Sequence, residues 1–185
     1  KLWGIGLVQA IIRWMELTAL GIFVFQLTES PFWVAMVGFS HILPLFLFGS
    51  LLGLFSEKYQ RKKIIFISYF ILSIINSLLF FLAIFEVLEL WHILFGTFLS
   101  GIIWAEDFPV RMGLISDEIN ESFLSKAVGL DLTTSNICRI IGPFVAGIYM
   151  SSIGIEALYI SGVIFMLVGS QIAYKLKETN NSNEN

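Results

Sequence analysis

Six long apolar stretches alternate with short polar segments along the chain. They cover residues 2–27, 32–55, 64–85, 88–108, 127–150 and 155–174. Each is close to the roughly 20 apolar residues that an α-helix needs to cross the hydrocarbon core of a bilayer. Backbone in contact with lipid must satisfy its hydrogen bonds within the segment, which a helix does. The pattern therefore predicts an all-α membrane protein, with a bundle of six transmembrane helices over residues 1–176.

The composition supports lipid as the solvent for much of the chain. Hydrophobic residues make up 57% of the sequence and charged residues only 14%, about half the charged share of an ordinary soluble domain. The last nine residues, 177–185, are polar and of low complexity, which predicts a cytoplasmic linker or terminus. We therefore expect the lipid bilayer to be the main partner of residues 1–176.

The sequence lacks the motifs of several other classes of protein. The single cysteine, Cys138, lies in an apolar run, so a disulfide framework and a thiolate metal site are excluded. No phosphate-binding loop and no zinc-protease motif occurs. We expect no cofactor, no metal, no nucleic-acid partner and no enzymatic activity.

The positive charges predict the orientation in the membrane. The first, third and fifth connections contain no Lys or Arg, whereas the opposite side of the predicted bundle carries Lys1, Lys58, Arg61, Lys62, Lys63, Arg111, Lys126, Lys175 and Lys177. Basic residues accumulate on the cytoplasmic side of membrane proteins. The pattern thus predicts that both termini are cytoplasmic.

Ionisable residues within the apolar stretches mark the candidate site, because such groups are costly in a membrane and usually functional. Gln9, Arg13 and Glu16 are spaced four and three apart, so they share one face of the first helix. Arg13 and Glu16 are either a structural ion pair or, alternatively, Glu16 is a carboxylate whose protonation is coupled to transport. In the fifth helix Asp131 and Arg139 lie two turns apart. For Arg139 we expect an acidic partner (Asp131 or Glu16) or a substrate anion.

The connection between the second and third helices resembles a signature of the major facilitator superfamily. That pattern is Gly, three residues, Asp, a basic residue, any residue, Gly, Arg and another basic residue. The matching residues are Gly53, Lys58, Arg61 and Lys62, with Glu57 in place of Asp and Gln60 in place of the second Gly.

The fifth helix carries a second resemblance to that superfamily. Residues 139–147 are similar to the Gly-Pro-x-x-Gly-Gly motif of its antiporters, through Gly142, Pro143 and Gly147, with Ala146 replacing one Gly. The whole chain looks like the macrolide and siderophore efflux branch, whose members are described as transmembrane secretion effectors. It corresponds to the first six of the usual twelve helices.

The resemblance implies a fold and a set of roles. The six helices would form 3+3 inverted repeats, the amino-terminal half of a major facilitator transporter. Gly53 would let two helices approach closely, and Glu57 would sit at a helix N-terminus of the missing half. Arg61 would pair with Asp107, or with Glu106, as a cytoplasmic gate. The motif of the fifth helix, Gly142, Pro143 and Gly147, would bend that helix where it meets the other half.

The function that follows is export of a small amphipathic molecule across a bacterial cytoplasmic membrane by proton antiport. We expect the natural chain to be about twice this length, with a second six-helix half as partner. The alternatives are a non-transporting membrane assembly or accessory protein, and a six-helix transporter that acts as a dimer. An apolar interior with few charges suits drugs, siderophores, lipids and peptides alike, so the sequence selects no substrate.

Overall fold

The computed structural model describes residues 2–175, apart from the side chains of residues 2, 55, 57, 58, 118 and 121. Every element in this range is helical: α1 (Leu2–Thr28), α2 (Pro31–Lys58), α3 (Arg61–Ile84), α4 (Leu90–Glu118), α5 (Glu121–Ser152) and α6 (Ile155–Tyr174). The prediction of an all-α chain with six helices is therefore confirmed. The predicted linker 177–185 lies outside the described residues.

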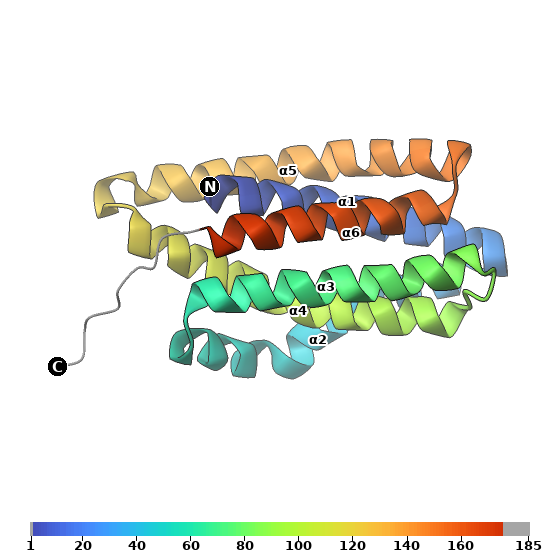
Figure 1. Ribbon diagram of the computed structural model, residues 1–185, viewed down its shortest axis with the longest axis horizontal. Helices are drawn as coiled ribbons and strands as arrows, with labels where there is room; N and C mark the ends of the chain where they lie inside the picture. Colours follow the sequence, from blue (N-terminus) through green and yellow to red (C-terminus); the bar gives the residue numbers. More distant parts are fainter. Residues whose placement is uncertain (1, 176–185) are drawn as a thin grey trace.

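The helices form one bundle in which successive helices run in opposite directions (Figure 1). The most extensive contacts join α3 to α6, α1 to α5 and α2 to α4. In Figure 1, α3 and α6 lie in front, and α1 and α4 lie behind them. The start of α1, the end of α6 and the connections α2–α3 and α4–α5 share one end of the bundle.

Five of the six helices are long and apolar enough to cross a membrane, namely α1, α2, α3, α4 and α6. The chain is accordingly a multi-pass membrane protein. α5 does not reach that threshold and is the least hydrophobic helix of the six. The reason is its polar middle, which contains Asp131, Asn136 and Arg139. These side chains lie on a helix whose contact with α1 is one of the most extensive in the bundle.

One predicted connection is wrong. Residues 111–126 were expected to form a polar loop, but α4 continues to Glu118 and α5 begins at Glu121. Arg111 is consequently a helical residue, and it is buried rather than exposed in the cytoplasm. Arg111 is therefore a charge of the bundle interior. It does not count among the basic residues of the connections, from which the orientation was predicted.

Glycines allow the closest helix approaches, at the two pairs α1–α5 and α2–α4. A Cβ on Gly142 of α5 would lie 2.6 Å from the Cβ of Trp14 and 3.0 Å from the backbone nitrogen of Met15 in α1. A Cβ on Gly101 of α4 would lie 2.2 Å from the carbonyl oxygen of His41 in α2. Small residues permit this kind of contact in membrane bundles. The two approaches hold α1 and α4 in fixed positions relative to their neighbours.

The other motif glycines behave differently from what the family pattern implies. A Cβ on Gly53 or on Gly147 would meet no atom within 4 Å among the described residues. The expected close helix approach at Gly53 is therefore not made within this chain. Gly142 packs against α1 of the same chain, where the resemblance implied contact with the other half. Pro143 lies inside α5, next to this contact.

Candidate functional site

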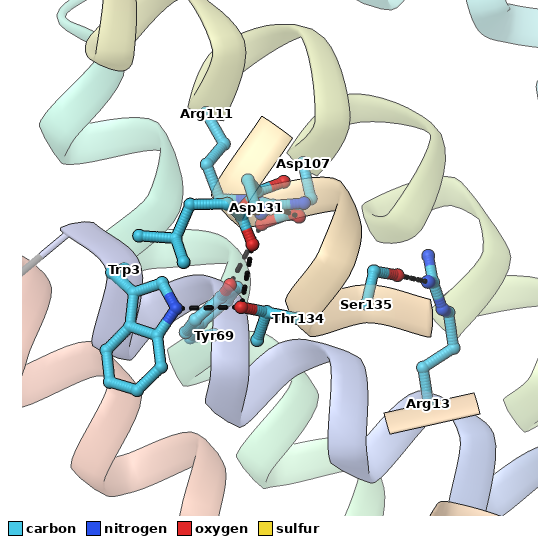
Figure 2. Close-up of polar contacts among 9 residues, drawn as sticks. Trp3, Arg13, Tyr69, Asp107, Arg111, Asp131, Thr134 and Ser135 are labelled. Atoms are coloured by element: carbon cyan, nitrogen blue, oxygen red, sulfur yellow. Dashed lines mark hydrogen bonds and ion pairs between the residues drawn. The ribbon is translucent and has the colours of Figure 1, made fainter. Parts of the chain in front are cut away.

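A buried cluster of charged residues joins α3, α4 and α5 around Arg111. The Arg111 Nε donates a hydrogen bond to the Asp107 Oδ2 at 3.2 Å, and its Nη1 donates to the Asp131 Oδ1. The Tyr69 hydroxyl donates to the other oxygen of Asp107 at 2.9 Å. All four side chains are buried, and Figure 2 shows them converging. The guanidinium thus compensates two carboxylates at once.

Local sequence spacing explains half of this cluster, and close packing explains the rest. Asp107 and Arg111 are four residues apart on α4, which places them on one helical face. α1 approaches the cluster through Gly6, because a Cβ there would lie 2.6 Å from the Arg111 Nη1 and 2.7 Å from the Asp131 Oδ1. Nearby, the Trp3 indole donates to the Thr134 hydroxyl at 2.8 Å. Four helices are therefore tied together in this region.

A second group of residues consists of two arginines, two tryptophans and a serine. The Arg13 Nη2 donates to the Ser135 hydroxyl at 3.2 Å, and Figure 2 shows this bond apart from the Arg111 cluster. The Arg13 guanidinium lies 5.2 Å from the ring centre of Trp14 and 5.4 Å from that of Trp104. The Arg139 guanidinium lies 5.0 Å from the Trp14 ring. Arginines are thus held by aromatic rings here, and not by acids.

Two of the interpretations left open for the membrane arginines are not met within the described side chains. Arg13 does not pair with Glu16, and Arg139 has no acidic partner there. Asp131, one of the acids considered for Arg139, is held by Arg111 instead. Glu16 is partly buried in α1 and has no ion pair or hydrogen bond within the described residues. A shared face in the sequence did not place these groups in contact.

Gln9, the remaining candidate of the first helix, is buried in α1. Over the described part of the chain, no three His, Cys, Asp or Glu side chains gather as metal ligands would.

The expected cytoplasmic gate has a different acidic partner. The Arg61 Nη1 lies 2.5 Å from the Asp117 Oδ2, so neither Asp107 nor Glu106 is its partner. Asp107 is occupied by Arg111, and Glu106 accepts a hydrogen bond from the Ser68 hydroxyl at 3.1 Å. The side chains of residues 57 and 58, also assigned to the gate, lie outside the described part of the structure.

Sequence reasoning missed several members of these groups, among them Arg111, Tyr69 and the tryptophans Trp14 and Trp104. Arg111 was placed in a loop, although its spacing of four from Asp107 was a usable signal. Tyr69 and Trp104 gave no such signal, since an aromatic residue in an apolar helix resembles any other packing residue. Their roles depend on which way each helix is turned.

Comparison with known proteins gives the family. Residues 1–184 match the family described as "Transmembrane secretion effector", a branch of the major facilitator superfamily. An uncharacterized major-facilitator-type transporter, YfiS of Bacillus subtilis, is 26% identical over 86% of this chain and 38% of its own length.

Two relatives have named activities. A staphyloferrin A transporter of Staphylococcus aureus is 24% identical over 75% of this chain and 35% of its own length. Macrolide efflux protein A of Streptococcus pyogenes is 25% identical over 80% of this chain and 37% of its own length. The chain therefore matches less than two fifths of each of these transporters.

Proposed function

The chain belongs to the transmembrane secretion effector family of the major facilitator superfamily, and on that premise we propose that it is the amino-terminal six-helix part of a secondary active exporter. The observation that carries the proposal is the concentration of charged side chains from α1, α4 and α5, joined by the Tyr69 hydroxyl of α3, inside a largely apolar bundle. Membrane proteins rarely place ionisable groups there without a transport or relay function. The substrate that we propose is a small amphipathic molecule, and the partner is a second six-helix half or a second copy of this chain.

We also propose that the helices form 3+3 inverted repeats. Exchanging α1, α2 and α3 with α4, α5 and α6 converts the α1–α5 contact into the α2–α4 contact and leaves α3–α6 unchanged. These are the three most extensive contacts of the bundle. This exchange of the most extensive contacts supports an internal two-fold relation.

The proposed orientation places both termini in the cytoplasm of a bacterium, with the bundle in the cytoplasmic membrane. Its support is that Arg61, Lys62, Lys63, Lys126 and Lys175 all belong to the end of the bundle where α1 begins and α6 ends. The row of basic residues is thus on one side.

Proton antiport is proposed to use Glu16. Asp107 and Asp131 share the Arg111 guanidinium, and Glu106 accepts a hydrogen bond from the Ser68 hydroxyl. Glu16 has no ion pair or hydrogen bond within the described residues. A carboxyl group without a counter-ion can gain and lose a proton with little disturbance of its surroundings.

The experiment that tests this mechanism is Glu16→Gln in the full-length natural protein, reconstituted in proteoliposomes. An amide cannot release a proton, so we expect a pH gradient to drive no uphill export while substrate still equilibrates across the membrane. The matched control is Glu86→Gln, a change of the same kind at an exposed turn residue, which should retain coupling. Uphill export by Glu16→Gln at the wild-type rate would exclude Glu16 as the coupling group.

The cytoplasmic gate is proposed to be the Arg61–Asp117 pair. Both side chains are nearly one-third exposed (28% and 29%), and such pairs contribute about 0–1 kcal/mol to folding. We therefore expect Arg61→Asp to impair transport strongly with little change in melting temperature. The exchange of both charges, Arg61→Asp with Asp117→Arg, should recover part of the activity. Lys63→Asp is the control, and equal loss in the single and exchanged variants would show that the two residues do not act as a pair.

A further inference from the structure

We propose that Arg13 and Arg139, together with the rings of Trp14 and Trp104, bind an anionic group of the transported molecule, which therefore carries a carboxylate or similar anion next to an aromatic or planar surface. This inference rests on the proposed transport function, whose substrate class it specifies. It concerns a site that is separate from the Arg111 cluster (Figure 2).

Neither Arg13 nor Arg139 makes an ion pair with an acid of the described residues. The ion pairs of the described side chains join Arg61 to Asp117, and Arg111 to Asp107 and Asp131. Arg13 and Arg139 take part in none of them. A cation within a membrane helix without a counter-ion is costly. A ligand that supplies the missing negative charge would remove this cost, and the same charge would attract it into the bundle.

The rings and the cations form a row across the bundle. The order in space is Arg139, Trp14, Arg13, Trp104 and His41, with centre-to-centre separations of 5.0, 5.2, 5.4 and 5.2 Å. α5, α1, α4 and α2 each contribute to this row. Guanidinium groups combine planar stacking with bidentate recognition of carboxylates and phosphates. A planar anion fits such a surface better than an aliphatic cation does.

Two hydrogen-bond donors of the site have no acceptor among the described residues. The Arg13 Nε and the Trp14 Nε1 are buried, and neither has a hydrogen-bond partner in the described part of the chain. Buried donors without partners are uncommon in folded proteins. Both belong to the residues that form the centre of the row, and each is a donor that an acceptor oxygen of a ligand would satisfy. Arg139 is exposed, which leaves one end of the row open to an incoming ligand.

The acids of the interior do not interfere with such a ligand. Asp107 and Asp131 are both engaged by Arg111. Glu16 makes no ion pair or hydrogen bond with Arg13 or Arg139. The proton-coupling group and the proposed anion site can therefore be tested separately.

The test compares three probes of the same shape that differ in charge: 1-naphthoate, 1-naphthamide and 1-naphthylmethylammonium. Binding to the purified full-length natural protein is measured by titration calorimetry without a pH gradient, so that the result does not depend on proton coupling. We expect the anion to bind about tenfold or more tightly than the amide, because hydrogen bonds to a charged group are stronger than those between neutral groups. The ammonium should bind most weakly.

Variants assign the preference to the two arginines. Arg13→Gln and Arg139→Gln should each remove most of the difference between naphthoate and naphthamide while leaving the affinity for naphthamide nearly unchanged. Lys126→Gln is the matched control, because Lys126 also lies over an aromatic ring (Phe123, 5.3 Å) but belongs to the start of α5. It should keep the wild-type preference.

A second measurement distinguishes a ligand anion from an acidic side chain of another part of the transporter as the partner of Arg139. If Arg139 has no acidic side chain as partner, Arg139→Gln should leave the melting temperature unchanged or raise it. A decrease as large as that of Arg111→Gln would reveal such a partner and overturn the proposal. Equal affinity of the wild-type protein for naphthoate and naphthamide would also overturn it, even if Glu16→Gln abolished proton coupling as expected.

Discussion

Arg111→Gln should be among the most destabilising single substitutions in this protein, lowering the free energy of unfolding by about 3–5 kcal/mol. The change would leave Asp107 and Asp131 buried without the cation that both contact. Two desolvated carboxylates at short range repel each other, and the bundle must open or take up protons to relieve them. Denaturant unfolding of the purified protein in detergent, followed by circular dichroism, would measure the loss.

Two further variants identify the cause of that loss. Arg61→Gln removes an arginine from a partly exposed pair and should cost less than about 1 kcal/mol. Arg111→Gln combined with Asp131→Asn should be more stable than Arg111→Gln alone, because one of the two uncompensated acids is neutralised. If Arg111→Gln unfolded at the same denaturant concentration as the wild-type protein, the cluster would not be a structural element of the bundle.

Gly142→Ala should separate α1 from α5 and lower the free energy of unfolding by about 1–3 kcal/mol, the usual range for overpacking. The new Cβ would lie 2.6 Å from the Trp14 Cβ and 3.0 Å from the backbone nitrogen of Met15. Backbone atoms cannot move aside as a flexible side chain can. Because Trp14 lies between Arg13 and Arg139, the same displacement should weaken naphthoate binding.

Gly147→Ala is the matched control for this substitution. It lies on the same helix, and its new Cβ would meet no described atom within 4 Å. Alanine has a higher helix propensity than glycine by about 1 kcal/mol, so this variant should be as stable as the wild-type protein or more stable. Thermal unfolding of the two variants side by side would show the contrast. Equal stability of Gly142→Ala and Gly147→Ala would mean that α1 and α5 are not in close contact at Gly142.

The pairing of charges was the part of the site that sequence reasoning predicted least well. Arg61 was expected to reach Asp107 and instead contacts Asp117, about three turns further along α4. The error followed from ending the fourth helix at residue 108, because the remaining residues are polar. A helix that continues beyond the hydrocarbon core carries polar residues without losing its backbone hydrogen bonds, so hydropathy marks the membrane boundary and not the helix end.

The sequence by itself determined the number of helices and their approximate limits. It also determined that the basic residues of the connections gather on one side of the predicted bundle. These properties are local, since a segment's length and apolarity decide whether it is helical in lipid. Only the tertiary structure decided that Arg111 joins Asp107 to Asp131, and that Arg13 and Arg139 lie over tryptophan rings. Those contacts depend on how far each helix is rotated about its axis and which helix lies beside it. In this bundle the close approaches at glycines such as Gly142 and Gly101 help to set both, and their partners are distant in sequence.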